Sequence, residues 1–231
     1  MNKTISFMLQ RLFFVLILAN ISFGSYASID KKNPYIMIQT AANIAFKRFA
    51  QDQVNIQKDP NILKKIVREE LIPYVDYKYA AFKVIGSGNL RKTTREQRDK
   101  FVIIFRNYLI TQYAQVFTRY NNQQVIFEPA KDFSNKKILA VKTTIIDPKL
   151  GKIDIEFKVK KNKKTGDWKA FDLIAEGVSL LDSKQAELSS LIRQKGLDYV
   201  GELLQEKSLR DIKLKLNKKL EMKVKQVKTS Q

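Results

Sequence analysis

Reactive side-chain types are scarce in this sequence. Its 231 residues include 43 Lys and Arg and 23 Asp and Glu residues, but no His and no Cys. Without Cys the chain cannot form a disulfide, a thiolate nucleophile, or a zinc–thiolate or iron–sulfur site. Without His it lacks the commonest general base and metal ligand, and therefore the usual Ser–His and Cys–His pairs. Any catalysis would have to depend on a carboxylate, a Lys or a Tyr.

The best-placed carboxylates are Asp154 and Glu156, two residues apart in a strictly alternating segment, which puts both on one face of a strand. Their apolar neighbours face the other way, so we expect both carboxylates to be exposed. A general acid needs a carboxyl group shielded from water, so an enzyme of glycosidase type is the weakest interpretation. Asp172 and Glu176, near the end of the next strand, are equally undistinguished.

Two glycine-containing segments fall short of catalytic motifs. Gly86-Ser87-Gly88 lacks the spacing and the Lys of a phosphate-binding loop. Gly177-Val178-Ser179 begins like a nucleophile elbow, but the second Gly is missing and no His exists to activate the Ser. We therefore interpret Trp168 and Gly177 as structural, and expect Gly177 at a backbone angle that other residues resist. The sequence does not predict an enzyme.

The first 27 residues have the layout of a secretory signal peptide. Lys3 and Arg11 flank a polar start, residues 12–21 are strongly apolar, and Ser25 and Ala27 are small residues before the expected cleavage point. The apolar run is shorter than the ~20 residues of a transmembrane helix, although an uncleaved anchor is the alternative. Because this segment holds two basic and no acidic residues, cleavage would lower the net charge from +20 to +18. A Cys-free, Lys-rich exported chain suits a bacterial periplasm.

Helices are predicted first along the remaining chain, from residue 28. Asn33-Pro34 and Asp59-Pro60 each place a capping residue before a Pro at the first helical position. A short helical segment should end near Gly86. The Thr94–Gln97 segment has the capping-box form and should open the longest helix, which runs to about Arg119.

Beyond residue 122 the hydrophobic period changes from helical to two-residue. Short turns separate the segments of this part, which predicts an antiparallel meander of about four strands over residues 123–128, 137–146, 153–159 and 168–175. Helices over 182–195 and 197–205 should follow, separated by Gly196 as a cap. The order predicts a single α+β domain over residues 28–206.

The long helix after Thr94 carries apolar residues on more than one stripe, whereas a surface helix needs only one. Such a helix is either central in a core or lines a cavity between the helices and the sheet, whose apolar face is a natural opposite wall. From periodicity alone, ordinary core packing is the simpler interpretation. Composition and pattern therefore do not select a ligand.

Residues 207–231 form a basic tail with nine basic and two acidic residues and no aromatic residue. Leu209, Ile212, Leu216 and Leu220 fit a helical stripe. The tail could contact an anionic membrane or polyanion, at about 1 kcal/mol for each Lys near an anionic surface, but a solvated tail is the simpler alternative. Nucleic acid is not expected, because aromatic residues are not interleaved with the basic ones as a stacking surface requires.

Several motifs follow one another along residues 33–205: Asn33-Pro34-Tyr35, Pro73 with Asp76, Gly86, the Thr94–Arg98 segment with Phe101 and Phe105, and the stretch W-K-x-x-D-x-x-x-E-G-x-S-L-L that begins at Trp168. Their order resembles the MlaC family, the periplasmic phospholipid-binding components of the Mla lipid-transport system, also called toluene-tolerance or ABC-transporter auxiliary proteins. Two features depart from the family. Gly88-Asn89-Leu90 stands where an aromatic residue is usual, and the basic tail lies outside the resemblance.

The resemblance implies a curved antiparallel sheet packed with helices around a deep apolar pocket, which takes phospholipid acyl chains and leaves the headgroup near solvent. It implies a periplasmic carrier between an outer-membrane lipoprotein–porin complex and an inner-membrane ABC transporter complex with an MCE-domain ring, maintaining outer-membrane lipid asymmetry in a Gram-negative cell. Bound phospholipid is the expected ligand, without cofactor, metal or covalent chemistry, and we expect a monomer. The alternative is an exported basic interaction module that binds anionic membrane or polyanion through its C-terminal tail.

Inward-facing apolar residues are the candidates for the lipid pocket, although core packing suits each of them equally well. They lie on the long helix, on the strands and in the W-K-x-x-D motif: Phe101, Phe105, Leu109, Tyr113, Phe117, Val141, Ile153, Ile155, Phe157, Val159, Phe171, Ile174 and Val178.

Overall fold

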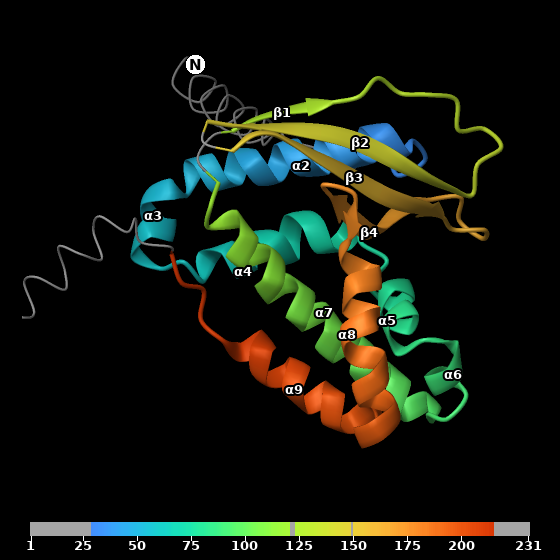
Figure 1. Cartoon of the computed structure of the whole chain (residues 1–231). Coiled ribbons are helices and arrows are strands. Elements are labelled where there is room, and N and C mark those ends of the chain that lie inside the picture. The colour runs from blue at the N-terminus through green and yellow to red at the C-terminus, as the bar shows by residue number, and fades with distance from the viewer. Residues whose placement is uncertain (1–28, 121–122, 149, 215–231) are drawn as a thin grey trace, which may run out of the picture.

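A computed structural model describes residues 29–120, 123–148 and 150–214. An antiparallel sheet lies over a layer of helices, and its strands are neighbours in chain order (Figure 1). The strands are β1 (Gln124–Phe127), β2 (Ile138–Asp147), β3 (Gly151–Lys161), β4 (Trp168–Ala175) and β5 (Val178–Ser179). The predicted α+β class and antiparallel meander are confirmed. The fifth strand, with two residues, is too short to leave a periodic signal.

The register separates the two faces of the sheet. Val141 is opposite Phe157, and Thr143 is opposite Ile155, so these four residues, three apolar and one the buried Thr143, share one face. Lys142 is opposite Glu156 on the other face, where their side chains form an ion pair at 3.3 Å. Asp154 is exposed, as expected from the alternation.

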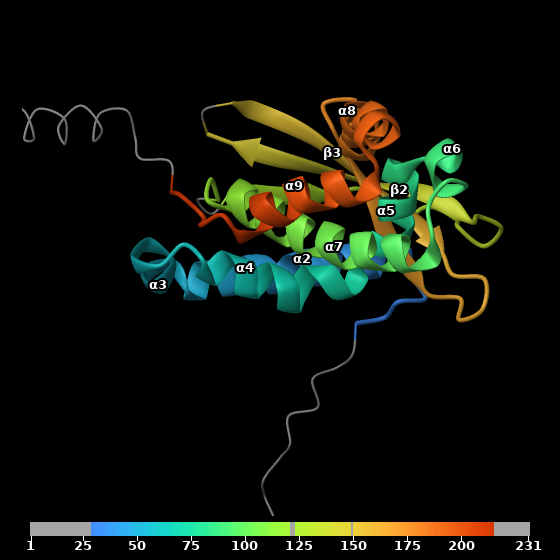
Figure 2. The ribbon, with the colours of Figure 1, turned by 90° about the horizontal axis from the view of Figure 1, so that it is seen from below.

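The helical layer contains one long central helix, α7 (Arg95–Phe117), which contacts α9, α5 and α4 (Figure 2). The predicted capping box at the amino-terminal end of α7 is confirmed. The Thr94 hydroxyl accepts a hydrogen bond from the backbone N–H of Gln97, and the Gln97 side chain accepts one from the backbone N–H of Thr94. The other helices are α2 (Pro34–Gln51), α3 (Gln53–Lys58), α4 (Ile62–Ile66), α5 (Tyr77–Ile85), α6 (Ser87–Leu90), α8 (Leu180–Lys195) and α9 (Leu197–Leu209).

The predicted start of α2 and the predicted ends of α5 and α8 are also confirmed, whereas α4 begins at Ile62 and not directly after Asp59. The Asn33 side chain accepts hydrogen bonds from the backbone N–H groups of Tyr35 and Ile36 at the start of α2. Gly86 and Gly196, with φ of 78° and 88°, end α5 and α8 in the left-handed region that favours Gly.

The segment after Asp59-Pro60 differs from the single regular helix that was predicted. Helix α4 passes into a π-helical turn over Val67–Leu71 and a 3-10 turn over Ile72–Tyr74. The Arg48 guanidinium on α2 bonds the carboxylates of Glu69 and Glu70 on the π-helical turn, the former at 2.6 Å. A π-helical turn is set by such tertiary contacts, which helix propensity does not reveal.

Helix α2 covers part of the apolar sheet face. Met37 and Ile38 of α2 pack with Val141, Val159 and Trp168 in one buried cluster. Two further clusters lie among the helices, one on each side of α7. The sheet is therefore fixed at its α2 side by close packing, while the rest of the inner surface faces α7 and α8.

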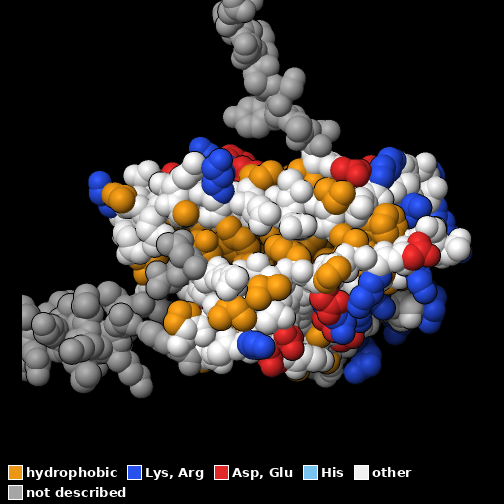
Figure 3. Space-filling model, turned by 90° about the horizontal axis from the view of Figure 1, so that it is seen from above, with side chains coloured by type: hydrophobic (Ala, Val, Ile, Leu, Met, Phe, Trp, Pro, Cys, Tyr) orange, Lys and Arg blue, Asp and Glu red, His pale blue; other side chains and the backbone are white. Residues whose placement is uncertain are grey.

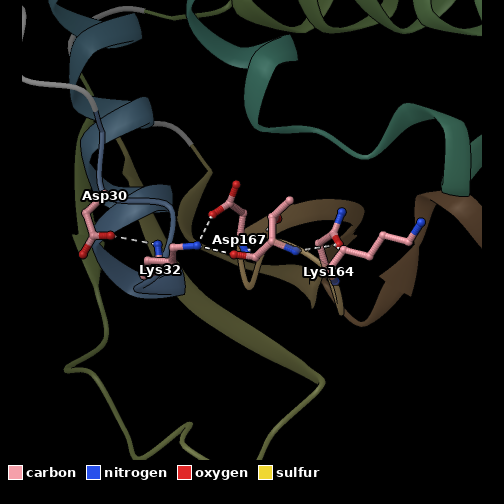
Figure 4. Close-up of polar contacts among 6 residues, drawn as sticks. Asp30, Lys32, Lys164 and Asp167 are labelled. Atoms are coloured by element: carbon pink, nitrogen blue, oxygen red, sulfur yellow. Dashed lines mark hydrogen bonds and ion pairs between the residues drawn. The ribbon is translucent and has the colours of Figure 1, made fainter.

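The chain enters the fold at the β3–β4 hairpin. The Lys32 ammonium forms an ion pair with Asp167 at 2.8 Å and also bonds the backbone carbonyl of Thr165 (Figure 4). The backbone carbonyl of Lys31 accepts from the N–H of Trp168 at 2.7 Å. These contacts fix the first described residues. The predicted signal peptide, residues 1–27, lies outside the described residues.

At the other end, the described chain stays packed on the domain beyond residue 206. Helix α9 ends at Leu209, and Ile212 is only 3% exposed. The first part of the predicted basic tail is thus in contact with the domain, and residues 215–231 lie outside the described residues.

Candidate functional site

A cavity of about 310 Å³ lies between α7, β4 and α8. Most of its wall is apolar, and the apolar side chains come from all three elements and from the start of α5. The polar lining is confined to a few side chains. The apolar lining consists of Val75, Ala80, Phe105, Tyr108, Leu109, Tyr113, Val116, Phe171, Leu173, Leu180 and Leu181.

Helix α7 contributes one continuous row to this wall. Phe105, Leu109 and Tyr113 are spaced by four residues, which places them on one face of the helix. Phe101, one turn earlier, is 1% exposed in the core beneath α9 and does not reach the cavity. Phe117, one turn later, packs against Phe49 with ring centroids 4.5 Å apart.

A bulge in β4 directs a further aromatic residue, Phe171, to the cavity. Lys158 pairs with Asp172 and Val159 with Ala170, so Phe171 is the extra residue of the strand. Its ring meets that of Tyr79 edge-on, with centroids 5.1 Å apart. Phe171 and Leu173 of β4 both line the cavity.

The α8 wall is anchored by a buried carboxylate. Asp172 is 8% exposed and accepts hydrogen bonds from the Ser179 hydroxyl at 2.8 Å and the backbone N–H of Leu181 at 3.0 Å. Lys158 lies 3.9 Å from the same carboxylate. Asp172, which the sequence did not distinguish as a catalytic carboxylate, thus has a structural role: it holds the amino-terminal end of α8 against β4. Its partners lie across a turn, so no local pattern identifies this role.

Tyr113 marks the deep part of the cavity. Burial, and then the nearby charge of Asp172, raise the pKa of Tyr113 from 10.0 to about 12. Its side chain nevertheless keeps some accessible surface, as expected on a cavity wall. Within the described part of the chain its hydroxyl has no hydrogen-bond partner. A hydroxyl in this position can donate to a polar group of a bound ligand.

The cavity mouth combines exposed apolar side chains with charged ones. Val116 and Leu180 are 62% and 46% exposed although both line the cavity. Lys184 bonds the Glu187 carboxylate and lies over the Tyr108 ring. Burial lowers the pKa of Lys184, but the bonds to Glu187 and Tyr108 outweigh it, so the net shift is upward and the ammonium stays charged.

The cavity brings together four of the predicted pocket residues: Phe105, Leu109, Tyr113 and Phe171. The remaining strand candidates lie elsewhere on the sheet. Val141, Phe157 and Val159 pack with α2, and Ile155 and Ile153 share their face farther along β3. Ile174 pairs with Glu156 and so lies on the opposite face, and Val178 is 56% exposed.

Apolar surface is not confined to this cavity. Seen from the sheet side, apolar side chains gather in a hollow that runs across the middle of the molecule (Figure 3). A separate depression of about 480 Å³, between α6 and α8, is lined by polar and basic residues that include Arg91, Lys92 and Arg193. Its polarity does not suit an acyl chain.

Grouped metal-ligand side chains and membrane-spanning helices are both absent from the described residues. Over residues 29–214, apart from the gaps, no three His, Cys, Asp or Glu side chains are grouped to hold a metal ion. Within the same ranges no helix is long and apolar enough to span a bilayer.

Comparisons with known proteins agree with the motif resemblance. Residues 39–206 match the family model described as MlaC protein. The chain is 33% identical over 186 residues to the intermembrane phospholipid transport system binding protein MlaC of Haemophilus influenzae, covering 80% of this chain and 86% of that protein.

A solved structure shares the fold. The phospholipid-binding protein from Ralstonia solanacearum, determined in complex with a phospholipid, superposes with a TM-score of 0.67 at 19% identity, covering 76% of this chain and 97% of that one. The family model and the Haemophilus relative together cover most of the folded domain. The chain therefore belongs to the MlaC family.

Proposed function

We propose that this protein carries phospholipid through the periplasm, with the acyl chains held in the cavity between α7, β4 and α8. The apolar wall formed by Phe105, Leu109, Tyr113 and Phe171 is the observation that carries the proposal. Support comes from the related proteins, one named as an intermembrane phospholipid transport component and one solved with a bound phospholipid.

The free energy needed to move an unprotected phospholipid through water is large. Burying one methylene is worth about 0.8 kcal/mol, so a lipid with about 30 chain methylenes would need more than ~20 kcal/mol to cross water unprotected. A carrier removes this barrier by offering an apolar wall in place of water. Because chain burial does not read the headgroup, the protein should accept several headgroup classes.

The cavity must widen to hold a diacyl lipid. Its volume of about 310 Å³ is at the lower end of ligand pockets, which are about 300–1,000 Å³. Widening would require α8, which Asp172 holds to β4 at its amino-terminal end, to move away from α7. Spin labels at Arg119→Cys, two residues after the end of α7, and at Ala186→Cys on α8, in a chain without other Cys, should report a larger separation of the two sites after lipid loading.

A role in lipid transport between the two membranes would follow from phospholipid binding. The protein would shuttle lipid between an outer-membrane lipoprotein–porin complex and an inner-membrane MCE-domain ABC transporter, and so maintain outer-membrane lipid asymmetry. It would act as a monomer without cofactor or catalytic step, after its signal peptide directs it to the periplasm.

Binding is tested with delipidated protein and phospholipids that carry a fluorophore on one acyl chain. Phosphatidylethanolamine and phosphatidylglycerol should both give a shielded fluorophore with comparable affinity. Loaded protein should then exchange lipid with inner-membrane and with outer-membrane vesicles from the source cells. A fluorophore that stays accessible to an aqueous quencher would overturn the carrier, and exchange with one membrane only would overturn the shuttle.

A further inference from the structure

One basic side chain of α8 lies in the wall of the cavity between α7, β4 and α8. Among the described residues of that lining, Lys184 is the one with a positive charge. Its side chain is 25% exposed, and its ammonium lies 5.6 Å from the centroid of the Tyr108 ring, which belongs to the same wall. The ammonium is therefore held at the boundary between the apolar wall and solvent.

Lys184 belongs to a group of three charges whose sum is positive. One oxygen of the Glu187 carboxylate accepts from the Lys184 ammonium, and the other lies 3.9 Å from the ammonium of Lys207 on α9. Two cations thus share one carboxylate, which leaves a charge of +1 beside the cavity mouth. Burial alone would lower the pKa of Lys184, but its bonds to Glu187 and Tyr108 raise it overall, so the ammonium is charged at neutral pH.

The Lys184 ammonium can bind a further anion. An ammonium has three N–H donors, and the contacts with Glu187 and Tyr108 engage two of them at most. The other acidic side chain of the lining, Asp172, pairs instead with Lys158, at 3.9 Å. A donor of Lys184 is thus left for an anionic oxygen that enters the cavity mouth.

A phospholipid would place such an oxygen at this point. Its phosphodiester joins the acyl-chain part to the headgroup, so the phosphate stays at the edge of the apolar wall when the chains lie along it. We propose that Lys184 binds the phosphate of the carried lipid through a charge-assisted hydrogen bond, and that the protein thereby prefers phospholipids to uncharged diacyl lipids. All phospholipids contain this phosphate, so the preference is compatible with several headgroup classes. The inference rests on the proposed function, because it needs the acyl chains in this cavity.

Two ligands that differ in the phosphate test the proposal on delipidated protein comprising residues 28–231. They are dioctanoyl phosphatidylglycerol and dioctanoylglycerol, which have the same two short chains. Each ligand is titrated against protein loaded with the acyl-labelled phospholipid. The quantity compared between variants is the ratio of the two dissociation constants, because a change in acyl-chain binding affects both and cancels in the ratio.

Lys184→Gln should lower the preference for phosphatidylglycerol about tenfold or more and change dioctanoylglycerol binding by less than about twofold, as expected when one charge-assisted hydrogen bond is lost. Lys184→Arg keeps a cation and should keep most of the preference. Glu187→Gln should raise the preference, because it removes a carboxylate that repels the phosphate and shares the ammonium. The matched control is Lys195→Gln, which removes one positive charge from the exposed end of α8 and should leave the ratio unchanged.

Four outcomes would contradict the proposal. An equal loss of preference in Lys184→Gln and Glu187→Gln would assign the effect to their ion pair, and an equal loss in Lys195→Gln would assign it to overall charge. A ratio that Lys184→Gln does not change would show that the phosphate lies elsewhere, while phospholipid carriage stands. If the unaltered protein binds neither ligand nor the acyl-labelled phospholipid, the proposed carrier is wrong, and the phosphate site with it.

Discussion

The carboxylate of Asp172 accepts a hydrogen bond from the backbone N–H of Leu181 at 3.0 Å, which joins β4 to the first turn of α8. The same carboxylate accepts from the Ser179 hydroxyl. Asp172→Ala should lower the free energy of unfolding by about 3 kcal/mol, because it leaves a buried N–H group without an acceptor and removes charge-assisted hydrogen bonds. Urea denaturation measures the change.

Asp182→Asn is the matched control for Asp172→Ala, since Asp182 is exposed on the same turn of α8 and its side chain makes none of the described contacts. It should cost less than about 1 kcal/mol, the size of a helix-dipole effect. Equal losses in the two variants would show that Asp172 is not the anchor of α8.

A larger side chain in the cavity should weaken phospholipid binding without unfolding the protein. Leu109→Trp places a larger ring in the α7 wall, at a packing cost of about 1–3 kcal/mol. Binding of the acyl-labelled phospholipid should weaken about tenfold or more, which corresponds to about 1.4 kcal/mol. Ile103→Trp, on the same helix but 50% exposed, should bind as the unaltered protein does. Unchanged binding by folded Leu109→Trp would place the lipid elsewhere.

Tyr113 should ionise late on alkaline titration. Because its pKa is raised from 10.0 to about 12, the native state keeps this proton between pH 10 and 12 while the unfolded state releases it. The stabilisation from Tyr113 is therefore complete below pH 10 and is lost as the pH rises through 12. The absorbance at 295 nm of the unaltered protein minus that of Tyr113→Phe isolates this group. A difference midpoint near pH 10 would contradict a buried phenol.

The end of α9 and the segment after it contain two aliphatic residues, three positions apart, with opposite burial. Ile212 is 3% exposed and Leu209 is 71% exposed. Ile212→Ala should lower the free energy of unfolding by about 3 kcal/mol through lost burial and a cavity, whereas Leu209→Ala should change it by less than about 0.5 kcal/mol. Thermal denaturation should give a lower midpoint for Ile212→Ala than for Leu209→Ala. Similar midpoints would mean that the segment after α9 is not packed on the domain in solution.

Local chemistry made much of the fold predictable. The Thr94 and Gln97 capping box, the Asn33 cap, and the Gly residues at 86 and 196 act through neighbours within a few residues, so their roles can be recognised in the sequence alone. Gly177 likewise has the positive φ, 76°, that was expected. Strict alternation along β3 predicted its faces for the same reason.

Non-local contacts account for what could not be predicted. Ile212 fits a helical stripe in the sequence, yet it lies in the non-helical segment after α9, where Asn61, just before α4, and Gln115 of α7 bind the backbone. Asp172 shows its role only when β4 and α8 meet. The same limit applies to the site. The helical spacing of an apolar residue such as Phe101 or Phe105 is the same whether it packs in the core or lines the cavity.

Mass spectrometry of the protein comprising residues 28–231, purified from a bacterial periplasm without detergent, tests the carrier most directly. Under native conditions the mass should exceed that of the polypeptide, and denaturation should release the difference as phospholipid of more than one headgroup class. A folded protein with the mass of the polypeptide alone and no extractable lipid would contradict phospholipid carriage.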